Sequence, residues 1–310
     1  MRLIPGVPEP SGCLSDFLAA NAHAFSRADL VADWSRHQLD SSVRSSSIVR
    51  VLPGVYSARV HASNPVVLGE AANLWCPRGL VTGELALHLY ANGLQAPTYA
   101  DLVVAQGDAM HAPRWVRVHQ TGLPRYRGSA EGVHCVTPER ALMDAWRFAK
   151  PALRRGLLYE SLWARVCSWR QLQHELNRTP RVAGRRDLEL LLGWFAEGAT
   201  TPLEVLAKHE TFANVRFREF EWQVKLRLGQ RHLTVDMLHR KADLVVELDG
   251  DRYHSTREAR DADRERQTDL AAAGFLTVRF GWNDLFRRPA WCRDRLLRAL
   301  ESRLARPSST

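Results

Sequence analysis

The stretch VDMLHRKADLVVELDGDRYH, residues 235–254, decides how the C-terminal third of the chain is interpreted. It contains two apolar runs typical of β-strands, which acids interrupt at Asp236, Glu247 and Asp249. The runs predict a hairpin with a four-residue loop at residues 239–242. Because side chains alternate along a strand, Glu247 and Asp249 should project to one face, and we expect Asp236 beside them.

These acids need an explanation, because like charges on one strand face repel each other and resist burial. One explanation is structural: the nearby cations Arg240, Lys241 and Arg279 would pair with them. The other is a divalent ion, Mg²⁺ or Mn²⁺, held by the three carboxylates. Mg²⁺ prefers oxygen ligands and keeps water and substrate phosphate in its remaining positions. Such an ion would polarise a scissile phosphate and activate water, so the spacing favours a metal-dependent site.

The sequence around this hairpin, residues 196–310, predicts the element order αβββαβα. Thr200 or Thr201 can cap the first helix, and Pro202 opens it. The second helix begins in an S-x-x-E capping box and ends at Gly274. Strands are expected in REFEWQVKL, RHLTVDML, ADLVVELDG and FLTVRF.

These features resemble the PD-(D/E)XK restriction-endonuclease-like superfamily, in which an acid before a hairpin is followed by acid-x-lysine on the next strand. The fuller pattern is similar to the domain of proteins related to very-short-patch repair endonucleases (Vsr-like), over about residues 200–305. The matching elements are Glu204 in the first helix, Gln223 on the first strand, Val235-Asp236, VVELDG, Tyr253-His254, the helix RDADRERQTDLAAAG and the strand LTVRF.

This resemblance implies roles for individual residues. Asp236 matches the main metal-binding aspartate, and Glu247 and Asp249 fall at the acid-x-lysine. Glu204 matches a first-helix acid that supports the metal or a water. His254 matches a histidine thought to act as general base, since a neutral imidazole can accept the proton of attacking water near neutral pH.

Four further residues are expected to support this site. Gln223 would orient its first-strand side. Asp263 and Arg266 share one helix face and are predicted to be supporting or packing groups. Arg279 would contact phosphate or neutralise the acids.

The sequence departs from the superfamily pattern at the lysine, because Asp249 stands in its place. Lys225 or Lys241 could reach the acids from elsewhere, or His254 could take over the role. Otherwise the domain would bind metal or DNA without cutting.

The N-terminal block, residues 1–62, predicts three helices followed by the β-ribbon IVRVLPGVYSARV, which is the order of a winged helix-turn-helix. Arg44 would lie on the recognition helix, with Arg50 and Arg59 on the wing. The alternative is a small α+β packing module without a DNA contact. FSRADLVADW followed by IVRVLPGVYS is similar to the N-terminal domain of AbiEi-type antitoxins of type IV toxin-antitoxin systems. Their RGVY is PGVY here, with Pro53 replacing the arginine.

The middle block, residues 63–195, is predicted to be a mixed α/β region whose Trp, Leu and Ala stripes form core rather than a ligand site. Its VHCVTPERALMDAWR resembles the TP-x-R-x-L-x-D helix of the same antitoxins. The whole chain is therefore expected to be a multidomain α+β or α/β protein.

The composition points to a polyanionic partner. The net charge is +9 and the pI about 9.7, which favours nucleic acid. The five cysteines are scattered without metal-ligand spacing, as expected for reduced thiols in a cytoplasmic protein. No signal peptide and no membrane span are predicted.

Two functions are consistent with these patterns. The first is a Mg²⁺-dependent DNA endonuclease, targeted by its own winged helix. The second is a non-enzymatic DNA-binding regulator of antitoxin type, which would have a cognate toxin as partner. RNA cleavage stays open, as does a homodimer, which many nucleases of this kind need to cut both strands.

Overall fold

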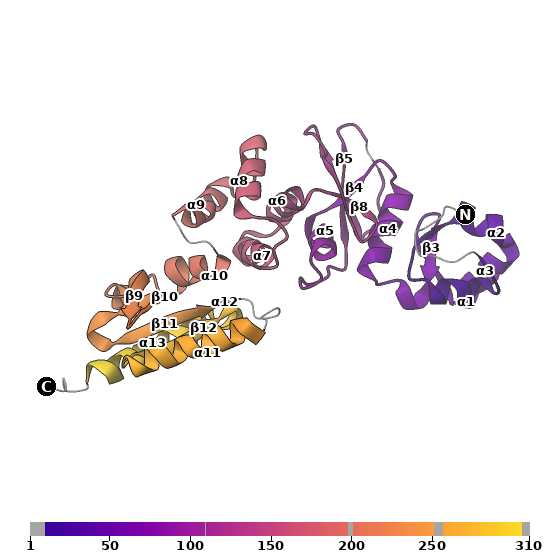
Figure 1. Cartoon of the computed structure of the whole chain (residues 1–310). Helices are drawn as coiled ribbons and strands as arrows, with labels where there is room; N and C mark the ends of the chain where they lie inside the picture. Colours follow the sequence, from indigo (N-terminus) through magenta and orange to yellow (C-terminus); the bar gives the residue numbers. More distant parts are fainter. Residues whose placement is uncertain (1–9, 109, 198–200, 251–256, 306–310) are drawn as a thin grey trace. The chain divides into compact units, whose positions relative to one another are not determined.

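The computed structural model describes residues 10–108, 110–197, 201–250 and 257–305. The chain forms two compact units, Met1–Glu189 and Leu190–Thr310, and helix α9 (Arg185–Ala196) runs across their boundary (Figure 1). Helices and several β-sheets occur together, so this is a multidomain α+β protein. The predicted division after residues 62 and 195 stays a prediction.

The first unit begins with three short helices around a small sheet of strand order β1-β3-β2. Ser26 caps the second helix, because its hydroxyl accepts a hydrogen bond from the Asp29 amide at 3.1 Å. One apolar cluster, with members from Leu14 to Ala58, packs these elements together. They are α1 (Leu14–Ala20), β1 (Phe25–Ser26), α2 (Arg27–Asp33), α3 (Arg36–Arg44), β2 (Ile48–Leu52), β3 (Val55–Ala58) and the 3₁₀ turn η1 (Arg59–His61).

The rest of the first unit is built on a five-stranded mixed sheet of order β6-β5-β4-β8-β7. Helix α6 packs beside it and is buried along most of its length, up to the fully buried Trp146. The elements are α4 (Pro65–Trp75), β4 (Leu80–Thr82), α5 (Gly83–Tyr90), β5 (Ala100–Ala105), β6 (Val116–Thr121), β7 (Arg127–Ala130), β8 (Val133–Val136), α6 (Pro138–Phe148), α7 (Pro151–Trp163), α8 (Trp169–Arg178) and α9.

The second unit contains a four-stranded sheet of order β12-β11-β10-β9. Only β11 and β12 are parallel, and α11 makes the crossover between them. The elements are α10 (Pro202–Val205), the π-helical η2 (Leu206–Thr211), η3 (Val215–Phe217), β9 (Glu221–Leu228), β10 (Arg231–His239), η4 (Arg240–Ala242), β11 (Leu244–Asp249), α11 (Arg257–Ala272), β12 (Leu276–Gly281), α12 (Trp282–Arg287) and α13 (Pro289–Leu304).

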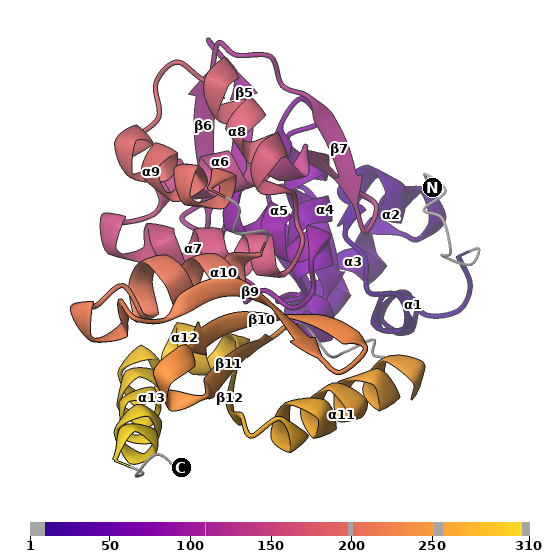
Figure 2. The ribbon, with the colours of Figure 1, turned by 60° about the vertical axis from the view of Figure 1, so that its left-hand side comes forward.

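Helices pack against both faces of this sheet (Figure 2). On one face Leu270 of α11 belongs to an apolar cluster with Val245 of β11. On the other face, the Phe280 ring of β12 packs near two aromatic rings. Its centroid lies 5.7 Å from that of Phe212, which follows η2, and 6.2 Å from that of Trp291 in α13. Strand β9 lies at the sheet edge, and every second residue from Glu221 onward is exposed.

The hairpin between β10 and β11 forms one residue later than predicted. His239 pairs with Leu244, so the loop is residues 240–243 rather than 239–242. Residues 240–242 form a 3₁₀ turn, and Asp243 closes it in the left-handed conformation at φ 45°. Aspartate tolerates this conformation better than most residues, which explains the shift.

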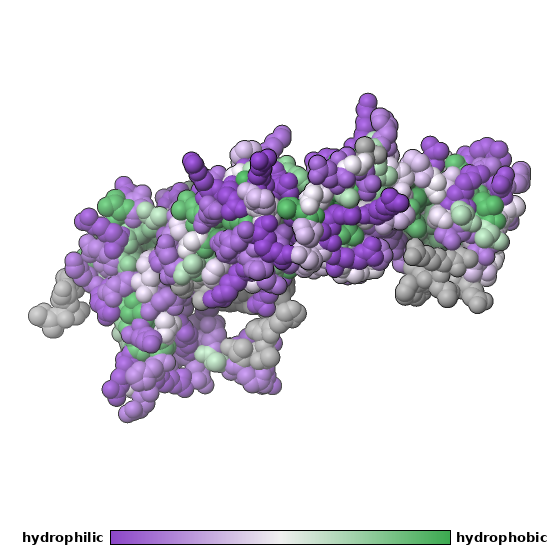
Figure 3. All heavy atoms as spheres, turned by 90° about the horizontal axis from the view of Figure 1, so that it is seen from above, coloured by the Kyte–Doolittle hydropathy of each residue, from purple (hydrophilic) through white to green (hydrophobic). Residues whose placement is uncertain are grey.

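Hydrophilic residues cover most of the face in Figure 3, and hydrophobic residues form small separate patches. Among the described helices, none combines the length and apolarity that crossing a bilayer requires. The five cysteines are free, and four of them are buried.

Two glycines with left-handed backbones provide a test of local packing. Gly83 opens α5 at φ 64°, where a Cβ would lie 2.9 Å from Oδ2 of the buried Asp101. Gly54 turns β2 into β3 at φ 76°, with open space around it. Gly54→Ala should therefore cost about 1–2 kcal/mol of folding free energy, from backbone strain alone.

Gly83→Ala should cost clearly more, because the strain is joined by the clash with Asp101. Urea unfolding of the two variants would measure the difference. Equal losses would show that Asp101 moves aside freely.

Candidate functional site

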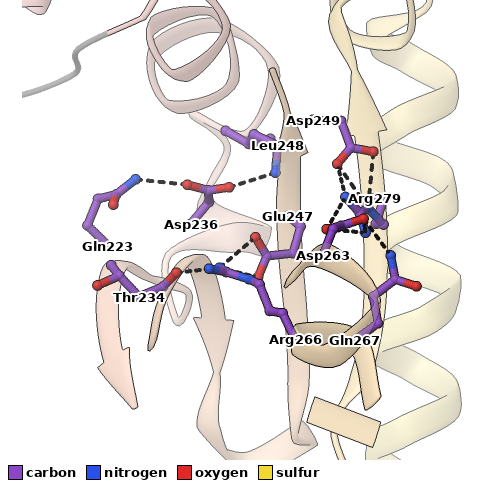
Figure 4. Close-up of polar contacts among 10 residues, drawn as sticks. All are labelled: Gln223, Thr234, Asp236, Glu247, Leu248, Asp249, Asp263, Arg266, Gln267 and Arg279. Atoms are coloured by element: carbon purple, nitrogen blue, oxygen red, sulfur yellow. Dashed lines mark hydrogen bonds and ion pairs between the residues drawn. The ribbon is translucent and has the colours of Figure 1, made fainter. Parts of the chain in front are cut away.

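Asp236 lies where β10 and β11 stop pairing. The last pair of the hairpin is Met237 with Val246, and beyond it the Asp236 carboxylate accepts the Leu248 amide at 2.7 Å. Its other oxygen accepts Nε2 of Gln223 at 3.0 Å (Figure 4). Both partners are neutral, so in the described part of the chain the charge of Asp236 has no cation bonded to it.

The backbone of Gln223 has an unusual conformation. Its φ is 53°, a left-handed conformation in the middle of β9. Val235 pairs with Val224 and Met237 with Trp222, but the described strand pairs skip Asp236 and Gln223 between them. Such strain in a non-glycine residue costs about 1–3 kcal/mol and is often found at functional sites.

Glu247 is held by Arg266 of α11. One guanidinium nitrogen, Nη2, lies 2.8 and 3.0 Å from the two carboxylate oxygens and also donates to the Thr234 carbonyl. The Glu247 side chain is only 12% exposed. Burial raises its pKa, the Arg266 hydrogen bond and charge oppose this effect, and the nearby charge of Asp236 adds to it.

Asp249 lies on the same strand face and is engaged separately. Its carboxylate accepts Nε of Arg279 at 2.9 Å, and Nη1 of Arg279 lies 3.1 Å from both oxygens of Asp263. Nε2 of Gln267 also donates to Asp263, at 3.0 Å. These bonds, first of all those to Asp249, raise the pKa of Arg279 and keep it charged.

The site is unbalanced in charge. Asp236 is close enough to Glu247 for its charge to raise the Glu247 pKa, and Arg266 is the cation bonded to Glu247 (Figure 4). With these three groups ionised, two negative charges and one positive charge leave an excess of one negative charge. A divalent cation would compensate this excess.

The structural explanation of the acids holds in part, with different partners. Arg279 does pair with Asp249. However, Arg240 binds Glu221 at 2.6 Å and Lys241 binds Glu219 at 3.3 Å. The Lys241 side chain is therefore engaged outside the acid cluster.

The described residues contain no group of three or more His, Cys, Asp or Glu side chains arranged to hold a metal ion. Mg²⁺ does not need one, because one or two carboxylates with water and phosphate suffice. Asp236 and Glu247 are two such carboxylates. They are close enough for the charge of Asp236 to raise the pKa of Glu247, and their hydrogen bonds are to groups other than Arg279. Asp249 is directed to Arg279 instead.

Glu204 makes a local contact within helix α10 of this unit. Glu204 forms a capping box with Thr201 at the start of α10, where its carboxylate accepts the Thr201 amide at 3.3 Å. This contact orders the helix start, and a metal role for Glu204 stays a prediction. His254 lies outside the described residues.

The three arginines that were predicted to contact DNA, Arg44, Arg50 and Arg59, are all exposed. Arg44 ends α3, and Arg50 is in the centre of β2. Arg59 follows β3 and donates from Nε to the Ser46 carbonyl at 2.6 Å, so its side chain reaches back to the α3–β2 turn. Their contact with DNA stays a prediction.

Arg266 and Asp263, which were expected to be supporting or packing groups, both bond to residues of the acid cluster. Arg266 is bonded to Glu247, and Asp263 is bonded to Arg279. The available signal was their spacing with Leu270, which places all three on the sheet-facing side of α11. Arg266 and Asp263 also line a pocket of about 510 Å³ on this unit, which leaves part of the cluster accessible.

The raised pKa of Glu247 predicts a pH-dependent effect on stability. A carboxyl group whose pKa is raised by folding destabilises the fold once it is ionised. Glu247→Gln should therefore increase the melting temperature at pH 8, and the gain should shrink as the pH falls toward about 4.3, the ordinary glutamate pKa.

Thermal melts of both proteins from pH 4 to 8 would measure this gain. The exposed Glu265→Gln on α11 serves as a control and should show no comparable gain. A Glu247→Gln protein less stable at pH 8 would mean that the Arg266 pair outweighs burial.

The comparisons with known proteins address the C-terminal part. A model of the restriction-endonuclease-like family REase_MTES_1575 matches residues 210–300. No curated protein matches the chain. Among solved structures, the RV2827C protein from Mycobacterium tuberculosis matches at 15% identity and a TM-score of 0.41, covering 63% of this chain and 78% of that one. A likeness at that level supports no statement about fold or function. The family match, which spans the acid cluster, supports a restriction-endonuclease-like C-terminal domain.

Proposed function

We propose that this chain is a Mg²⁺-dependent endonuclease that hydrolyses phosphodiester bonds in DNA. The observation that carries the proposal is the pair of neighbouring carboxylates, Asp236 and Glu247, to which a single guanidinium, that of Arg266, is bonded. A restriction-endonuclease-like domain over the same residues agrees with nuclease chemistry.

Asp236 and Glu247 are the residues that would hold the ion. When bound, Mg²⁺ polarises the phosphate and activates water for attack. Gln223 orients the Asp236 carboxylate, and the Leu248 amide fixes its other oxygen. These two bonds keep the ligand oxygens in place before the ion arrives, which reduces the cost of ordering them.

In the absence of the expected lysine, Arg266 is a cation bonded to one of the proposed ligands. It fixes Glu247 and carries a charge that can offset the negative charge developing on the phosphate. The Asp249–Arg279–Asp263 group anchors β11 and β12 to α11. We propose His254 as the base that accepts the proton of the attacking water as the phosphorus–oxygen bond to the leaving group breaks.

We further propose that the N-terminal part delivers the protein to DNA as a winged helix. The order α1, α2, α3 and the β2–β3 hairpin supports this, as does the exposed Arg44 at the end of α3. When exposed arginines contact the phosphates of DNA, they release condensed counterions. The affinity of such binding therefore falls as the salt concentration rises. The net charge of +9 agrees with this role.

Removal of either proposed ligand should abolish cleavage. Asp236→Ala and Glu247→Ala should each lower nicking of supercoiled plasmid in Mg²⁺ or Mn²⁺ by on the order of a thousandfold, because metal stabilisation is worth several kcal/mol. EDTA should have the same effect on the unchanged protein. Asp261→Ala removes an α11 carboxylate bonded to Arg264 and is the matched control. Equal nicking by Asp236→Ala and the control would refute the assignment.

Gln223→Gly should separate stability from activity. Glycine adopts φ 53° freely, so relief of roughly 1 kcal/mol of strain should leave the melting temperature unchanged or higher. Loss of the amide bond to Asp236 should still reduce nicking by about 10- to 100-fold, as for other groups that orient a metal ligand. A variant that is both stable and fully active would remove Gln223 from the mechanism.

A second candidate, a DNA-binding regulator of antitoxin type with an inactive nuclease domain, is favoured by one observation. Arg266 and Arg279 already bind two of the acids, and Asp249 stands where a lysine is expected. In that case plasmid would stay intact in Mg²⁺ and Mn²⁺ while salt-sensitive DNA binding is retained. A cognate toxin would then be the partner to seek.

A further inference from the structure

A second polar site lies in the first unit. Its residues are far in the sequence from those of the acid cluster. A pocket of about 500 Å³ opens where α6 ends and the loop between α8 and α9 begins. Its lining comes from the end of α6, the loop and the first residue of α9, namely Arg147, Phe148, Pro180, Arg181, Val182, Ala183 and Arg185. Figures 1 and 2 both draw α6, α8 and α9 beside one another.

The loop that forms one wall is held at both ends. Nε1 of the buried Trp146 donates to the Ala183 carbonyl at 3.0 Å. Nη2 of Arg185 donates to the Leu176 carbonyl at the end of α8, at 2.7 Å, and to the Thr179 carbonyl. The pocket wall is therefore a tethered part of the fold.

The lining is strongly cationic. It contains three arginines and no carboxylate. Arg147 pairs with the buried Asp144 at 3.0 Å, which Arg140 also contacts, and Arg185 contacts the exposed Glu189 at 2.8 Å. Arg181 is exposed, and within the described residues it has no ion-pair partner. The guanidinium of Arg185 is otherwise occupied, since its Nη2 donates to two backbone carbonyls and its Nε is buried. The exposed Arg181 therefore favours an anionic ligand with several acceptor oxygens.

An aromatic ring stands beside these charges. One face of Phe148 is stacked on His119, with ring centroids 3.7 Å apart and planes inclined by 8°. The ring is partly exposed and lines the pocket. Flat aromatic groups stack on such rings, with about 1–3 kcal/mol for a nucleobase. The volume falls within the range of small-ligand pockets, roughly 300–1,000 Å³.

We propose that this pocket binds a free nucleoside phosphate, with its phosphate at Arg181 and its base against Phe148. The site is independent of the proposed cleavage chemistry, because it lies in the first unit and shares no residue with the carboxylate site. The protein would then bind a small molecule in addition to the DNA that we propose as its substrate.

Calorimetric titration of the full-length chain tests the proposal with AMP, adenosine, inorganic phosphate and a short single-stranded oligonucleotide. AMP should bind with a Kd below about 1 mM. Adenosine and inorganic phosphate should each bind at least about tenfold more weakly, since each lacks one half of the recognition. Because Arg181 is exposed and unpaired, Arg181→Ala should fold normally and weaken AMP about tenfold, whereas Arg181→Lys should weaken it less.

Arg114→Ala removes another exposed arginine of the first unit and should leave AMP binding unchanged. No AMP binding in the unchanged protein would overturn the proposal, as would equal weakening in Arg181→Ala and Arg114→Ala. Phosphate binding as tightly as AMP would exclude the base contact, and binding of the oligonucleotide alone would exclude a free nucleotide. These titrations measure binding and do not depend on cleavage. Their outcome can therefore be judged whatever the result of the plasmid-nicking assay.

Discussion

The hydrogen bond from the Leu248 amide to the Asp236 carboxylate is the contact on which the C-terminal site depends. It replaces a backbone bond at the point where β10 and β11 separate. An unpaired buried amide costs about 1–3 kcal/mol, so the carboxylate stabilises the end of the strand as well as holding a position in the site. Since Leu248 lies between Glu247 and Asp249, the same bond fixes the strand segment that presents both acids.

The two arginines constrain what chemistry can occur there. A guanidinium stays protonated in proteins, so neither Arg266 nor Arg279 can accept or deliver a proton. A lysine at the Asp249 position could have taken part in proton transfer as well as in charge stabilisation. In the proposed cleavage these two tasks are separate: arginines would supply charge, and proton transfer would fall to another group, for which His254 is our proposal. The pH dependence of cleavage would then follow an imidazole rather than an amine.

Local features of the chain were predictable from the sequence, whereas nonlocal partners were not. The caps at Ser26 and Thr201 follow from short-range hydrogen bonding, and the shared face of Glu247 and Asp249 follows from strand alternation. The hairpin register was wrong because it depends on the left-handed Asp243. The pairing of Arg266 with Glu247 joins residues 19 positions apart, and no local pattern specifies which acid a helix cation meets. Assignment of the winged helix and of the metal ligands rests on resemblance and stays to be tested.

Strand β9 carries a further consequence of the conformation at Gln223. As an edge strand, it presents backbone N–H and C=O groups that a foreign strand could pair with, which is a common route to aggregation. The left-handed residue interrupts the regular spacing of these groups, and charged side chains at Glu221, Lys225 and Arg227 flank it. The irregularity that orients Asp236 therefore also protects the sheet edge, so that solubility and site geometry are coupled through a single residue.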